Sequence, residues 1–150
     1  MTTVVRSHRI LVHVLLLSAF DYVSDLARHP EWSSGRLTIQ AVAPGPVVVG
    51  KEYISHGAVA VQKDRRNTVR VTEYEPPHRF GFVAHDPDFG NVSHLFTFVE
   101  QGGDVLITRL MTLSLHPVVA VLFRGLVYPL IGHPAMERSL ALLKKKLETE

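Results

Sequence analysis

The sequence contains no cysteine in its 150 residues. Disulfide bonds, a thiolate nucleophile and a zinc–thiolate site are therefore excluded, and the absence fits a reducing compartment. Excess charge is also scarce, because 16 basic and 14 acidic residues leave a net charge of +2. The charged runs Lys63–Arg66 and Lys144–Lys146 are typical of a solvated turn and an outer helix face, so no nucleic-acid partner is expected.

Long uninterrupted apolar segments are missing as well. Residues 10–20 are apolar and follow basic residues, but no small-residue cleavage site comes after them, which argues against a signal peptide. A second apolar segment, 115–131, falls short of the roughly 20 residues that a spanning helix needs, because it is interrupted by His116, Pro117, Arg124 and Pro129. The sequence therefore predicts a cytoplasmic protein without a transmembrane segment.

Motifs for metal, phosphate or nucleophilic chemistry are absent from the sequence. Its nine histidines include neither an HxH pair on a predicted strand nor an HExxH motif. The sequence also has no glycine-rich phosphate loop and no GxSxG elbow. We therefore expect neither a native metal nor a cofactor.

What the sequence does contain is a series of short β-type runs separated by turn residues, which is typical of an antiparallel meander. A chain of this length suits one domain, residues 1–150, that buries roughly 70% of its unfolded surface. The predicted strands are Val4–His13, Leu37–Ala43, Glu52–Gln62, Thr68–Tyr74, Arg79–His85, Val92–Glu100 and Val105–Leu115.

Helical spacing is found on both sides of the meander. After the first strand, Phe20, Val23 and Leu26 share one face of a short helix, with Ser18 as its predicted N-cap. Pro30 disfavours helical angles at residue 29, so this helix should end near residue 28 and a second short one should follow.

The C-terminal segment predicts a long amphipathic helix from near His133 to about Leu147. An earlier helical piece can begin at Pro117, and Pro129 and Pro134 should break or kink it. The apolar stripe of the long helix consists of Met136, Leu140, Leu143 and Leu147.

This order of elements, together with particular residues, resembles the START-like (SRPBCC) superfamily, and within it the small bacterial polyketide cyclase/dehydrase-like proteins. The matching segments are Phe20–Asp25, Pro30–Trp32, Val49–Gly50, Val71–Phe80, Phe96–Phe98, Gly102–Gly103 and Met136–Glu148. The resemblance implies an α+β helix-grip fold, in which a curved seven-stranded antiparallel sheet surrounds the C-terminal helix and two short helices close one end of a cavity. Trp32, the only tryptophan, would then either seal the short helices onto the sheet or line the cavity mouth.

Alternation along the strands predicts which side chains face the interior. His94 and Arg109 are polar residues on otherwise apolar sets, although the strand of Arg109 also allows the opposite register. If both face inward, Arg109 can act as a fixed cation and His94 as a donor or general base. The predicted ligand-binding residues are Trp32, Tyr53, Ser55, Gly57, Phe82, His94, Phe96, Arg109, Met111, Met136 and Leu140.

Two classes of function fit these residues. The first is a binding protein for a small hydrophobic molecule of lipid, polyketide or isoprenoid type, because the inward residues are mostly apolar. The second is a polyketide cyclase or aromatase, as in the same superfamily, with His94, Arg109 and Tyr53 as catalytic candidates. A third role concerns the apolar stretch Val118–Ile131, which either roofs the cavity or forms a homodimer or membrane-surface contact.

Overall fold

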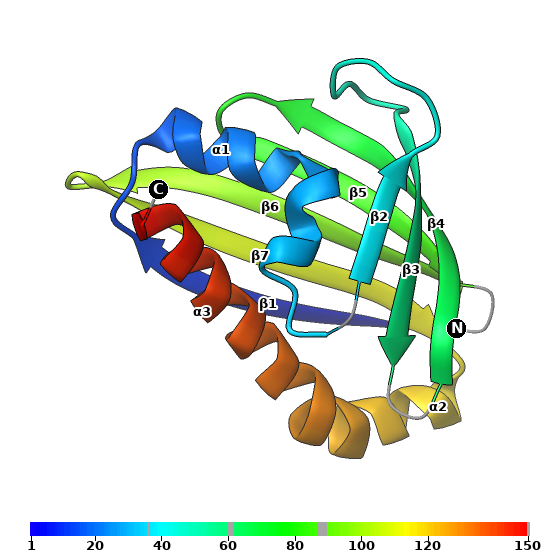
Figure 1. Ribbon diagram of the computed structural model, residues 1–150. Coiled ribbons are helices and arrows are strands. Elements are labelled where there is room, and N and C mark those ends of the chain that lie inside the picture. The colour runs from blue at the N-terminus through cyan, green and yellow to red at the C-terminus, as the bar shows by residue number, and fades with distance from the viewer. Residues whose placement is uncertain (36, 60–61, 87–89, 150) are drawn as a thin grey trace.

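A computed structural model describes residues 1–35, 37–59, 62–86 and 90–149 of the chain. It contains one curved antiparallel sheet that partly encloses a long C-terminal helix (Figure 1). The strands are β1 (Thr2–Val12), β2 (Leu37–Ala41), β3 (Glu52–Val59), β4 (Gln62–Glu75), β5 (Arg79–Asp86), β6 (Gly90–Gln101) and β7 (Asp104–Leu115). The helical elements are α1 (Leu16–Ser24), η1 (Leu26–Glu31), α2 (Pro117–Leu122), η2 (Phe123–Gly132) and α3 (His133–Thr149).

The sheet has the strand order β1-β7-β6-β5-β4-β3-β2. Strands β2 to β7 form a continuous meander, and β1 returns to pair with β7 at the far side. All neighbours are antiparallel, so the predicted seven-stranded helix-grip fold is confirmed.

Helix α3 packs its leucine stripe into the sheet. Leu140, Leu143 and Leu147 are buried in the same cluster as Phe20 of α1 and Phe98 of β6. The rings of Phe20 and Phe98 meet edge to face at 5.5 Å between centroids, so α1 and α3 share one apolar core. The predicted start of this helix and the three leucines of its stripe are correct, whereas Met136 is half-buried and packs against a second apolar cluster near Tyr128.

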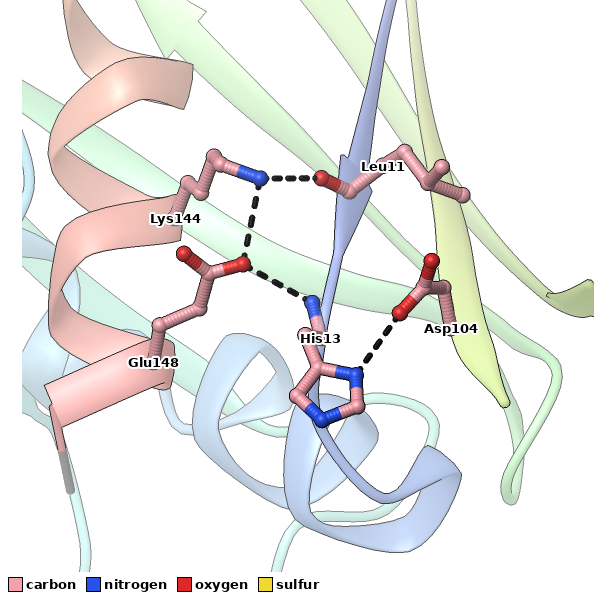
Figure 2. Close-up of polar contacts among 5 residues, drawn as sticks. All are labelled: Leu11, His13, Asp104, Lys144 and Glu148. Carbon is pink, nitrogen blue, oxygen red and sulfur yellow. Dashed lines mark hydrogen bonds and ion pairs between the residues drawn. The ribbon is translucent and has the colours of Figure 1, made fainter. Parts of the chain in front are cut away.

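Polar contacts hold the last turns of α3 against the end of β1 (Figure 2). Lys144 donates to the Leu11 carbonyl oxygen at 2.7 Å and pairs with Glu148 at 3.1 Å. Glu148 also accepts from the backbone N–H of His13 at 2.9 Å, and the His13 ring contacts Asp104 at 2.8 Å. The C-terminal end of α3 is therefore fixed in place by polar contacts as well as by leucine packing.

The first helical segment differs in detail from the prediction. Helix α1 begins at Leu16, with Leu15 as its N-cap and no side-chain cap, so Ser18 lies inside the helix. It ends at Ser24, earlier than predicted, and the 3₁₀ helix η1 then carries Pro30. Two short helices do follow β1, but the break between them precedes the proline.

Two other sequence predictions need correction. The charged segment Lys63–Arg66 lies within β4 rather than in a turn, because charge disfavours burial but not an extended backbone. The predicted break near Pro129 is also absent, because helical geometry persists from Pro117 to Thr149, but the helix does bend, since α2 and α3 run in different directions (Figure 1). The segment with Pro129 adopts the wider turns of a π-helix, which accommodate a proline without ending the helix.

Helices α2 and η2 bury Ala120 and Tyr128 against Val4 and Met111 at one end of the sheet, and they expose most of their other side chains. The stretch Pro117–Thr149 is also long and apolar enough to cross a membrane by length and composition, and 11% of its apolar window is buried. Many core helices and signal sequences pass the same test. The exposed side chains form what we call the apolar helix surface, which consists of Val118, Val119, Val121, Leu122, Leu126, Val127, Leu130 and Ile131.

Candidate functional site

Trp32 lies where η1 ends, between the short helices and the sheet. Its side chain is 2% exposed, and its ring meets His29 at 4.5 Å and Phe96 at 6.1 Å between centroids. The indole Nε1 is buried and has no hydrogen-bond partner among the described residues. Trp32 therefore packs η1 against β6, and its N–H is one of the few buried polar groups that a folded protein leaves unpaired.

Arg109 faces the interior, which settles the register that the sequence left open. Val105 and Ile107, which precede it at intervals of two on β7, are fully or almost fully buried. The guanidinium carbon of Arg109 lies 5.2 Å from the ring centre of Phe96 and 5.7 Å from that of Trp32. Two aromatic faces thus hold the cation.

The Arg109 guanidinium donates to the ring of His94 on the neighbouring strand β6. Its Nε and Nη2 atoms lie 3.4 Å and 3.3 Å from His94 Nδ1. Burial, together with the positive charge of Arg109, holds the pKa of His94 well below its usual value. Burial also lowers the pKa of Arg109, to about 10, so at neutral pH a protonated arginine faces a neutral imidazole.

His29 is a buried part of this site that sequence reasoning missed. Its Nε2 donates to the Val23 carbonyl oxygen at 2.7 Å, and burial lowers its pKa to about 3. A neutral ring therefore packs between Trp32 and Phe82. The available signal was its position in the same turn as Trp32, where the proline that follows it indicated only a helix end.

A pocket of about 250 Å³ lies between the end of η1, strand β7 and the start of α3. Arg109 supplies its positive charge, and the Ser139 hydroxyl accepts from the Ser34 backbone N–H at 3.2 Å. The pocket therefore combines one cation and a few hydroxyl groups with an aromatic and aliphatic wall. Its lining residues are His29, Trp32, Ser33, Ser34, Leu37, Arg109, Gly132, Ala135, Met136 and Ser139.

The predicted ligand-binding residues fall into three groups in the structure. Trp32, Arg109 and Met136 line the pocket. Phe82, His94 and Phe96 lie directly behind them, in ring contact with one another or with His29. The remaining predicted residues are not part of this lining: Tyr53, Ser55 and Gly57 lie on β3, Leu140 in the main core, and Met111 in the second apolar cluster near Tyr128.

A second polar cluster was missed because its members are far apart in the sequence. His8 on β1 meets His133 and Glu137 on α3, and the potential ligand atoms of the three lie within 4.8 Å of one another. Only the pair at i and i+4 on a helix, His133 and Glu137, gave a local signal. Local histidine motifs such as HxH and HExxH do not detect a ligand set whose members come from both ends of the chain.

Comparison with known proteins identifies the family to which the sequence is similar. Residues 4–148 match the family model described as polyketide cyclase / dehydrase and lipid transport. No protein with a curated function matches the sequence.

Solved structures share the fold at low sequence identity. The protein TTHA0849 from Thermus thermophilus is 18% identical with a TM-score of 0.74, over 95% of this chain and 96% of that one. The KanY protein (ms6282) is 17% identical with a TM-score of 0.73, over 99% of both chains. The di-domain aromatase/cyclase StfQ of the steffimycin biosynthetic pathway is 12% identical with a TM-score of 0.73, over 98% of this chain and 51% of that one. The fold and the match over nearly the whole sequence agree, and the chain belongs to the polyketide cyclase / dehydrase and lipid transport family.

Proposed function

We propose that this protein binds a small hydrophobic molecule, of lipid, polyketide or isoprenoid type, whose carboxylate or carbonyl oxygen contacts Arg109. The observation that carries the proposal is the environment of this arginine. Its contacts are the rings of His94, Phe96 and Trp32, and no carboxylate pairs with it among the described residues. A cation on an apolar wall without a counterion favours a ligand that supplies the negative or partly negative oxygen.

The size and lining of the pocket limit the ligand. A volume of about 250 Å³ is slightly below the roughly 300–1,000 Å³ of typical small-molecule sites. The pocket therefore suits a compact ring system, or the oxygen-bearing end of a longer ligand that extends past Met136 and Leu37.

The alternative function is a cyclase or aromatase reaction in the same pocket. The family description and the aromatase/cyclase StfQ, a structural neighbour, favour it. Against it, His94 and His29 have pKa values far below neutral pH, which makes them weak proton acceptors. We therefore rank ligand binding first and the enzyme second.

Native mass spectrometry of protein purified without added ligand tests this proposal and separates the two functions. Binding predicts a reproducible adduct that an organic solvent extracts unchanged and that returns when the extract is added back. A cyclase instead predicts that a compound added to the protein and then extracted again has lost water. Absence of any adduct, together with no binding of aromatic or fatty carboxylic acids, would contradict both.

We also propose that the protein forms a homodimer through the apolar helix surface. Large contiguous exposed apolar patches mark sites of contact with other proteins or with membranes. Light scattering after gel filtration should give twice the 16.7 kDa chain mass. Leu126→Asp should yield monomer, whereas Leu17→Asp, at a leucine of similar exposure on α1 (57% against 54%), should not.

A monomer at every concentration, or a dimer that Leu126→Asp leaves intact, would contradict the homodimer. Binding of the monomer to lipid vesicles would assign the apolar helix surface to membranes instead. The cytoplasmic location inferred from the cysteine-free sequence stays a prediction.

A further inference from the structure

The cluster of His8, His133 and Glu137 has the composition of a metal site. His8 Nδ1 lies 2.7 Å from Glu137 Oε1, and His133 Nε2 lies 4.0 Å from the same oxygen. The two imidazole rings are 5.0 Å apart between centroids. Two nitrogen ligands and one carboxylate oxygen therefore converge on one point from β1 and from the first turns of α3.

These distances suit a tetrahedral ion after small side-chain rotations. Zinc binds imidazole nitrogen at about 2.0–2.1 Å and carboxylate oxygen at about 2.0–2.2 Å, which places neighbouring ligand atoms about 3.3 Å apart. The separations here run from 2.7 Å to at most 4.8 Å and so bracket that value. His133 and Glu137 are exposed, so their side chains are free to rotate without disturbing the core.

The orientation of His8 is fixed from the opposite side. Its Nε2 contacts the hydroxyl of Tyr128, which is itself buried in η2. With Nε2 occupied in this way, Nδ1 is the nitrogen directed at Glu137. Metal-binding histidines in proteins characteristically have such a partner on the second ring nitrogen.

A simple ion pair explains less of this arrangement. His8 and Glu137 satisfy each other directly, but His133 at 4.0 Å is too far from Glu137 for a hydrogen bond. A shared metal ion would explain why His133 lies beside both His8 and Glu137.

We propose that His8, His133 and Glu137 bind one divalent transition-metal ion, zinc or a close relative, with a fourth position open to water or another ligand. The ion would link β1 to the beginning of α3. Gly132 and Met136, which neighbour the ligands in the sequence, line the pocket beside Arg109. Metal binding would therefore hold the helix turn that forms one wall of that pocket.

Isothermal titration of zinc into the full-length, untagged, chelator-treated protein tests the proposal. Wild type should bind one ion per chain, and His133→Ala and Glu137→Ala should each weaken binding at least about 10-fold, as losses around metal sites do. His85→Ala, at an exposed histidine on β5, is the matched control and should bind as wild type does. Both test variants alter exposed side chains, so they should fold.

Thermal unfolding with and without zinc provides a second measurement. An ion that binds only the folded state raises Tm in wild type and in His85→Ala, and it should leave Tm of His133→Ala unchanged. No binding to wild type, or equal binding by all variants, would overturn the proposal. The result is independent of whether the pocket binds an organic ligand, because zinc itself is the probe.

Discussion

Replacing one leucine of α3 by alanine tests whether the sheet holds this helix as described. Leu143 is fully buried, whereas its neighbour Leu142 is 37% exposed. Leu→Ala removes three carbon groups at about 0.8 kcal/mol each, or roughly 2.4 kcal/mol, when the leucine is buried. The cavity left behind raises the expected loss for Leu143→Ala to about 3–4 kcal/mol, within the observed range for buried leucines.

Leu142→Ala is the matched control, because it makes the same chemical change one residue away. We expect it to reduce the free energy of unfolding by about 1 kcal/mol or less, since much of that side chain already contacts water. Urea denaturation followed by circular dichroism measures both, with the slope m unchanged in each variant. Equal losses for the two variants would mean that the buried face of α3 has been assigned incorrectly.

Two further predictions concern pH and a close backbone contact. Burial lowers the pKa of His29 from 6.5 to about 3, so the folded state binds fewer protons than the unfolded state between these values, and stability should fall by about 1.4 kcal/mol per pH unit as pH drops below 6.5. Urea denaturation at a series of pH values measures this dependence. The free energy of unfolding should change less with pH in His29→Gln than in wild type, and an equal pH dependence would refute this origin. A Cβ atom at Gly132 would lie 2.7 Å from Cδ2 of Tyr128, so Gly132→Ala should destabilise by about 1–3 kcal/mol. A Cβ atom at Gly125 would have no atom within 4 Å, so Gly125→Ala should be neutral or stabilising by up to about 1 kcal/mol. Thermal unfolding measures both variants, and an equal loss of stability in the two would contradict the contact with Tyr128.

Much of the fold was predictable because its signals are local. Alternation correctly assigned Phe82 and Phe96 to the interior, and the leucine spacing correctly located α3. Both patterns follow from the geometry of one element, which repeats every two residues in a strand and every 3.6 in a helix. The resemblance then supplied the order in which these elements pack.

The rest depends on contacts between distant segments. Both faces of β7 contain apolar residues, so only the packing against Trp32 and Phe96 identifies the inward direction of Arg109. His29 joins the site because the short helix η1 turns toward the sheet, and His8 meets α3 only through the sheet order. No periodicity within a single element contains that information.

The most direct test of the ligand proposal uses Trp32, the only tryptophan, as a fluorescent reporter beside Arg109. Titration with 2-naphthoate and with neutral 2-methylnaphthalene measures the preference for a carboxylate. Arg109→Met should reduce that preference at least about tenfold, the equivalent of roughly 1.4 kcal/mol for a lost charged hydrogen bond, while Arg124→Met, at an exposed arginine, should retain it. An unchanged preference in Arg109→Met, or binding of naphthoate without any change in Trp32 fluorescence, would contradict the assignment of this pocket as the ligand site.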